Sequence, residues 1–244
     1  MTARGRMAGG WALRVVVLGL LAAGCGDDAP VAEPTDTERE TSGGETTRPR
    51  GEQPQITGLM GTIQREQVER AMRPRLSRLQ RCFAARMGDV ELLAGDIRLE
   101  FRIRTDGSVL WVYPQQSTIG DRATEQCILE VASQVRFSRP RGGEAEFSWG
   151  FGLESGAERP PLSWTEDALG SLAEELPELA TECGVGGPMQ VTAYVQPGGG
   201  VLAAGGTMPD AESAGALDCV LEGVRAWQMR DPGSYPAKIT FGVR

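Results

Sequence analysis

The sequence contains no histidine, and this absence disfavours several classes of function. Histidine is the side chain that most often acts as a general acid or base near neutral pH, and it is the commonest zinc ligand. Serine hydrolases with a Ser-His-Asp triad and zinc hydrolases are therefore poor models for this chain. We expect no catalytic residue, no cofactor and no metal site.

Basic residues are also few. The 244 residues include 25 Lys and Arg against 33 Asp and Glu, which gives a net charge of −8 and an isoelectric point near 4.8. Proteins that bind nucleic acid need a clustered excess of basic side chains to neutralise phosphates. We therefore expect no nucleic-acid partner.

Long apolar runs are missing from the sequence. Its main apolar run is too short to cross a bilayer comfortably. It spans residues 15–23 and follows Arg4, Arg6 and Arg14, which is the layout of an export signal. The run ends in LLAAGC, where small residues lead into Cys25. This ending resembles the lipobox of bacterial lipoproteins.

The lipobox resemblance implies acyl chains on Cys25 and removal of the signal peptide, residues 1–24. Two or three acyl chains hold a protein on a membrane far more firmly than one chain does. Gly26 follows the cysteine, and by analogy with enteric bacteria this favours a cell-envelope protein on the periplasmic side of the outer membrane. The alternative is an ordinary cleaved signal in which Cys25 has no role.

The next segment, residues 25–55, is rich in acidic residues, Thr and Pro and has almost no large apolar residue. Such a composition cannot bury enough surface to offset the entropy lost on ordering. We predict a disordered linker that holds the folded part away from the membrane.

The remaining sequence contains an internal repeat with a spacing of 92 residues. The segment CILEVASQVRFSRP from Cys127 is matched by CVLEGVRAWQMRDP from Cys219. The repeat predicts two tandem modules, residues 56–159 and a second, degenerate copy at residues 160–244.

Each copy has the pattern helix, strand, strand, helix, strand. Leu99, Phe101 and Ile103 alternate with charged residues, as in a half-buried strand, and the turn TDGSV corresponds to PGGGV in the second copy. Asp121 is a candidate N-cap for a helix, and Pro74 predicts a kink or a late start in the first helix. We predict an α+β fold of two small α-β-β-α-β modules, each with its helices packed on a three-stranded antiparallel sheet.

Four cysteines remain besides Cys25, two in each copy. Four cysteines allow three disulfide connectivities. Equivalence of the copies favours Cys82 with Cys127 and Cys183 with Cys219, because one bond between the two helices then serves both modules. The alternative, a four-thiolate metal site, normally shows close CxxC pairs, and none is present.

The first copy resembles a known family. The helix ending in Cys82, the strand IRLEFRIRTDGSV, the helix beginning EQCI and the segment RFSRPRGGEAEFSWGF are similar to the AgmX/PglI C-terminal domain of myxobacterial cell-envelope proteins linked to gliding motility. That domain itself resembles the TonB C-terminal domain. The resemblance covers about residues 60–153 and implies a periplasmic helix-and-sheet module without known catalysis.

The function that we expect is a non-enzymatic lipoprotein that acts as a protein-interaction or structural module. A three-stranded sheet has free edges, and such an edge accepts a strand of another chain through main-chain hydrogen bonds. Trp111 and Tyr113 share one face of the second strand and are Ala203 and Gly205 in the second copy. They are either a partner-binding patch or, as is commoner for aromatic residues in strands, part of the core.

The first helices of the two copies carry opposite charge. Seven arginines lie on one, and acidic residues replace them on the other: Arg65, Arg70, Arg73, Arg75, Arg78, Arg81 and Arg86 against Glu166, Asp167, Glu174, Glu175, Glu178 and Glu182. One explanation of this pattern is that both helix faces are simply solvated. The alternatives are attraction between the modules, or contact of the arginines with anionic lipid or glycan.

Two alternatives remain for the function. A peptidoglycan-binding or peptidoglycan-cleaving protein would use a carboxylate pair such as Glu174 with Glu175 or Glu144 with Glu146. The second copy would alternatively serve only to stabilise the first.

Overall fold

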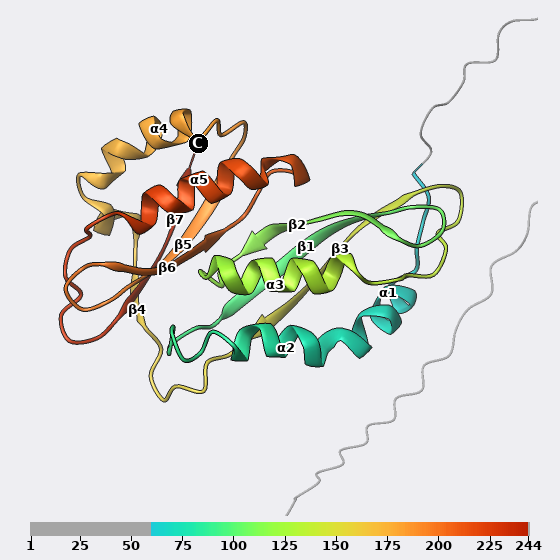
Figure 1. The fold of residues 1–244 in the computed structure, drawn as a ribbon, viewed down its shortest axis with the longest axis horizontal. Coiled ribbons are helices and arrows are strands. Elements are labelled where there is room, and N and C mark those ends of the chain that lie inside the picture. Colours follow the sequence, from blue (N-terminus) through green and yellow to red (C-terminus); the bar gives the residue numbers. More distant parts are fainter. Residues whose placement is uncertain (1–59, 244) are drawn as a thin grey trace, which may run out of the picture. The chain divides into compact units, whose positions relative to one another are not determined.

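The computed structural model describes residues 60–243, which belong to one compact unit. Cys25, the signal peptide and the linker lie outside the described residues, so the predictions about them remain predictions. The predicted α+β class is confirmed: the chain forms two sheets with helices packed on them (Figure 1). We call residues 60–159 the first half and residues 160–243 the second half.

The first half contains a three-stranded antiparallel sheet in the order β2-β1-β3. Its elements are α1 (Arg65–Met72), the 3-10 turn η1 (Arg73–Arg75), α2 (Leu76–Ala84), β1 (Gly95–Ile103), β2 (Val109–Ser117), α3 (Arg122–Ser133) and β3 (Ala145–Leu153). The turn η1 contains Pro74, which lacks the N–H needed to continue a regular α-helix. The predicted N-cap is confirmed, since the Asp121 carboxylate accepts a hydrogen bond from the Thr124 N–H at 3.0 Å.

The core of the first half lies between the sheet and the two helices α2 and α3. Leu99, Phe101 and Ile103 of β1 are fully buried, and Leu79 and Ile128 reach them from the helices. The other face of the sheet carries the charged residues that alternate with them, as the sequence pattern predicted.

The second half contains a four-stranded sheet in the order β4-β7-β5-β6. Its elements are β4 (Leu162–Trp164), the 3-10 turn η2 (Glu166–Leu169), α4 (Leu172–Glu182), β5 (Met189–Val195), β6 (Val201–Gly206), the 3-10 turn η3 (Ala211–Ser213), α5 (Ala214–Arg225) and β7 (Ala237–Val243). The prediction of a purely antiparallel three-stranded sheet is wrong for this half. The short strand β4 pairs in parallel with β7 and adds a fourth strand.

The two halves share local details at the spacing of 92 residues. Gly107 and Gly199 both have a positive φ, and each carbonyl accepts a hydrogen bond from the residue 30 positions later, Phe137 or Met229. A Cβ on either glycine would lie 2.2 Å from the carbonyl oxygen of that same residue. Glycine is therefore required at both positions for two reasons: the positive φ and the close approach of the backbone.

Each half is crosslinked by its own disulfide, which joins the helices on the sheet. Cys82 bonds to Cys127, and Cys183 bonds to Cys219, with Cα atoms 5.6 and 5.5 Å apart. These are the pairs that equivalence of the copies favours. Within residues 60–243, no helix is both long and apolar enough to cross a membrane.

Candidate functional site

Strand β3 lies at the edge of the first sheet, and its outer side pairs with no strand among the described residues. Asp96 of β1 bonds toward β2, because its carbonyl accepts the Thr118 N–H at 2.8 Å. Backbone groups of successive strand residues point to opposite sides, so Ile97 bonds toward its register partner Phe151 on β3. The N–H and C=O groups of Ser148 and its alternate neighbours consequently face outward.

The corresponding edge of the second half is covered by the chain itself. The Leu162 N–H donates to the Pro236 carbonyl at 3.0 Å, and β4 continues alongside β7 as far as Ile239. One turn later, the Glu166 carboxylate accepts a hydrogen bond from the Gly242 N–H at 3.1 Å. The outer side of β7 is thereby covered by β4 from Ala237 to Ile239 and bound by Glu166 at Gly242.

The equivalent segment of the first half starts the same way and then leaves the edge. Gly61 and Leu162 each lie 21 residues before the first disulfide cysteine of their half, and the Gly61 N–H donates to the carbonyl of Glu144, the counterpart of Pro236. Thr62 then pairs with Arg141, before β3 begins, and the chain enters α1. The edge of β3 is left uncovered from Glu146 onward.

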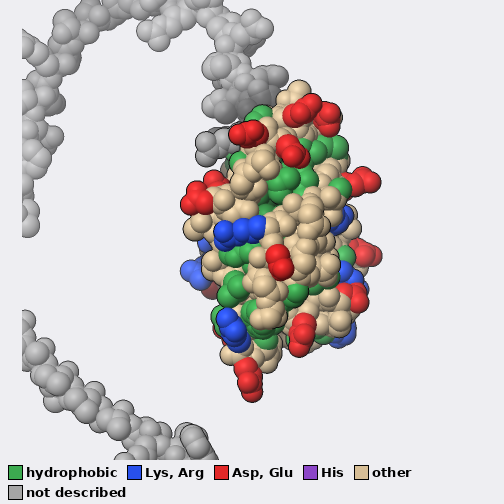
Figure 2. Space-filling model, turned by 90° about the vertical axis from the view of Figure 1, so that its left-hand side faces the viewer, with side chains coloured by type: hydrophobic (Ala, Val, Ile, Leu, Met, Phe, Trp, Pro, Cys, Tyr) green, Lys and Arg blue, Asp and Glu red, His purple; other side chains and the backbone are tan. Residues whose placement is uncertain are grey.

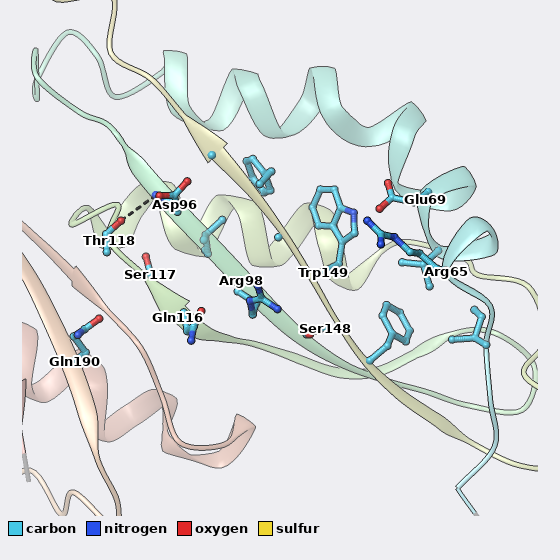
Figure 3. Close-up of a pocket in the computed structure, with 17 residues that line it drawn as sticks. Arg65, Glu69, Asp96, Arg98, Gln116, Ser117, Thr118, Ser148, Trp149 and Gln190 are labelled. Atoms are coloured by element: carbon cyan, nitrogen blue, oxygen red, sulfur yellow. Dashed lines mark hydrogen bonds between the residues drawn. The ribbon is translucent and has the colours of Figure 1, made fainter. Parts of the chain in front are cut away.

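A groove of about 1040 Å³ borders this uncovered edge (Figure 3). Its lining comes from α1 and the residue Ile63 before it, from the strands β1, β2 and β3, and from one residue of β5. The apolar lining residues are Ile63, Val68, Ile97, Phe147, Trp149 and Phe151, and the polar ones include Arg65, Glu69, Asp96, Arg98, Gln116, Ser148 and Gln190. The groove thus offers an unpaired strand beside apolar surface, which is the arrangement that strand addition uses.

Trp111 and Tyr113 lie elsewhere, on the sheet face opposite the helices. Both side chains are half-buried, and their rings are 5.5 Å apart. Tyr113 packs against the core of the second half, whereas the helix-side core of the first half contains neither residue. Tyr113 thus belongs to the packing between the halves and not to the core under the helices, and partner binding by either residue stays a prediction.

The two halves contact each other through a buried polar cluster at the start of α3. Glu125 is fully buried and accepts two hydrogen bonds, from the Ser117 hydroxyl at 2.6 Å and from the Gly206 N–H of the second half at 3.0 Å. Arg122, also buried, donates from Nε to Asp218 at 2.6 Å. Burial of the carboxyl group raises the pKa of Glu125 to about 7, and its two hydrogen bonds offset part of that rise.

A second contact between the halves involves the only lysine of the chain. Lys238 donates to the Ala94 carbonyl of the first half, and the Tyr194 hydroxyl accepts the Ala94 N–H and donates to the same carbonyl, both at 3.0 Å. Burial lowers the pKa of Lys238 to about 8. The Tyr194 ring completes the core of the first half, so the two cores share a boundary.

Small residues on β6 explain how the halves approach so closely. Ala203 and Gly205 stand where the first half has Trp111 and Tyr113. A Cβ on Gly205 would lie 2.6 Å from the Glu125 carboxylate and 2.8 Å from the Asp121 nitrogen. A side chain at position 205 would therefore obstruct this contact.

We expect Gly205→Ala to separate the halves partially. The added methyl group has no room, and overpacking of this kind costs about 1–3 kcal/mol. The free energy of unfolding should fall by about 2 kcal/mol, and acetylation of Lys238, followed by mass spectrometry, should become faster. Gly242→Ala is the matched control, because it also lies in a strand and its Cβ would meet no atom within 4 Å. Equal stability of the two variants would contradict the prediction.

The two candidate pairs of catalytic carboxylates lie in different halves of the described chain. Glu144 and Glu146 both pair with Arg102, at 2.7 and 3.3 Å, and Glu174 and Glu175 belong to the exposed first turn of α4. No group of three or more metal-binding side chains is found in residues 60–243.

The oppositely charged helices do not hold the halves together. Among the described residues, the ion pairs include Arg86 but none of the other six arginines of the first helices, and none of the acidic residues of η2 and α4. Figure 2 shows only acidic charged side chains at the top of the face that it draws, the end where Figure 1 places α4. Within residues 60–243, the ion pair that joins the two halves is Arg122 with Asp218.

Comparison with known proteins gives no relative: no family model, no curated protein and no solved structure matches this chain. The site therefore has to be interpreted from its own geometry.

Proposed function

We propose that this chain is a non-enzymatic cell-envelope lipoprotein whose folded part binds an extended segment of another envelope protein along β3. The observation that carries the proposal is the contrast between the two edges. The chain's own strand covers β7, whereas the equivalent edge of β3 has no strand partner within residues 60–243. The second half thus supplies a template for how the first half takes up a strand.

The energetics favour such an addition. Each main-chain hydrogen bond contributes about 0.5–1.5 kcal/mol net, and burial of apolar side chains contributes about 25 cal/mol per Å². The groove presents the partly exposed Phe147 and Phe151, whose counterparts Ile239 and Val243 are fully buried in the second half. An incoming strand gains both kinds of interaction.

The sequence supports the wider proposal. The likeness to the AgmX/PglI C-terminal domain favours two copies of one TonB-like module and a place in a gliding-motility or envelope-spanning assembly. The LLAAGC segment favours a lipid anchor at Cys25. In this scheme β4 covers the edge of the second copy, and the first copy covers a face of its sheet. The first copy is therefore the one that binds a partner.

Proline at the uncovered edge tests this function. We expect Ser148→Pro to abolish binding, because proline removes an outward N–H and obstructs a neighbouring strand. The fold should persist, since proline is tolerated at a sheet edge whose N–H faces solvent. The measurement is photo-crosslinking in living cells from a reactive amino acid at position 146, which is exposed on the outer face.

The wild-type protein should give a discrete adduct that Ser148→Pro removes. Ser148→Thr is the control, because threonine keeps the N–H and favours strands. An adduct of equal strength in the proline and threonine variants would refute strand addition at β3. Thermal melting of both purified variants establishes that they are folded.

A further inference from the structure

The uncovered edge carries a feature that its covered counterpart lacks. Glu166 and Arg65 each lie 17 residues before the first disulfide cysteine of their half. Where the second half places a carboxylate on the Gly242 N–H, the first half has a guanidinium at the equivalent position of the chain. The Gly150 N–H, which corresponds to that of Gly242, has no acceptor among the described residues.

A second arginine lies across from the same glycine. Arg98 is the register partner of Gly150, and its counterpart Gln190 is the partner of Gly242. Arg65 and Arg98 both line the groove, and neither belongs to an ion pair within residues 60–243 (Figure 3). A backbone donor and two free guanidinium groups therefore border one stretch of the groove, which is the chemistry that binds a carboxylate.

The acidic residues of the groove restrict where that carboxylate fits. Asp96 lies against Gly152, where a Cβ would come within 2.5 Å of its carboxylate, so a second acid is disfavoured at that end. Glu69 lies one helical turn from Arg65 on α1, beside Trp149 in Figure 3. The position at Gly150 lies between these two carboxylates.

We propose that the segment bound by β3 runs parallel to it and carries an acidic residue whose carboxylate binds Gly150, Arg65 and Arg98. This inference depends on the proposed strand addition and specifies the ligand. The direction and the spacing follow β4: Leu162 and Trp164 alternate toward the helix side, and the acid Glu166 comes two residues after Trp164. The partner segment accordingly has the pattern apolar, any, aromatic or apolar, any, acidic.

The chain itself supplies the probe for a test. A labelled peptide with the sequence of residues 160–166, acetylated and amidated to remove terminal charges, reproduces the template. Its binding to residues 54–244, which hold both cores and both disulfides, is measured by fluorescence anisotropy. The comparison peptide carries Glu166→Gln and differs only in charge.

We expect the acidic peptide to bind about tenfold more tightly than the Gln peptide, as charge-assisted hydrogen bonds predict. Arg98→Gln, which installs the residue of the second half, should reduce this preference and leave the affinity for the Gln peptide unchanged. Ser148→Pro should abolish binding of both peptides, which distinguishes β3 from displacement of β4 at β7.

The other outcomes separate the two proposals. Equal affinity for both peptides, lost in Ser148→Pro, would overturn the acidic specificity and leave strand addition standing. Binding of neither peptide, or binding that Ser148→Pro does not change, would overturn the proposed ligand pattern. In that case the cross-linking at position 146 decides strand addition independently.

Discussion

Replacing Cys82 and Cys127 together by alanine should lower the free energy of unfolding by about 4 kcal/mol. The bond closes a loop with a sequence separation of 45 residues, and on the chain-entropy model a loop of this length restricts the unfolded chain by that amount. Each half has a small core, so the disulfide supplies a large share of the stability that a domain of this size normally has. The measurement is urea unfolding of residues 54–244.

The second disulfide provides the comparison. Cys183 and Cys219 are separated by 36 residues, so the double alanine variant should lose nearly as much, about 4 kcal/mol. A loss below about 1 kcal/mol for either pair would contradict a stabilising role. Cys82 is buried whereas Cys183 is only partly buried, and the first pair should therefore show the larger effect.

The stability of the wild-type protein should fall as the pH rises from about 5 to 8, and Glu125→Gln should remove that fall. In the folded protein the pKa of Glu125 is raised from 4.5 to about 7 by burial. A raised carboxyl pKa means that the folded state binds the extra proton between these values. The stabilisation is fully present below pH 4.5 and is lost as the pH rises through 7.

The difference between the two pKa values corresponds to about 3 kcal/mol. Glutamine imitates the neutral acid, because its oxygen can accept from the Gly206 N–H while its amide donates to the Ser117 hydroxyl. The measured quantity is the stability difference between Glu125→Gln and wild type, which should increase with pH. Glu130→Gln is a suitable control, since Glu130 lies on the same helix and is exposed. A pH-independent difference would refute an ionisation at Glu125.

Much of the first half could be predicted from sequence because its signals are local. The alternation in β1, the Asp106-Gly107 turn and the Asp121 cap each act over a few residues, and the structure has them where the sequence places them. The disulfide pairing followed from a longer-range signal, the internal repeat. Gly107 and Cys127 recur 92 residues later as Gly199 and Cys219, whereas the first cysteine of each half does not keep this spacing.

The features missed were those that depend on contacts between distant segments. Strand β4 has only three residues, and nothing in Leu162–Trp164 alone distinguishes an edge strand from a linker. Glu125 has the position of an ordinary first-turn acid of a helix, yet it is buried and accepts a hydrogen bond from Gly206, 81 residues away. The sequence does carry one signal of that approach, because Trp111 and Tyr113 correspond to the small residues Ala203 and Gly205.

Strand β4 also sets the stoichiometry of the proposed strand addition. Because β4 covers β7, β3 is the only one of these two equivalent edges that lacks a partner strand within residues 60–243. Under the proposed strand addition at β3, one molecule should therefore bind one partner segment. Any higher-order array in the envelope would then have to originate in a multivalent partner.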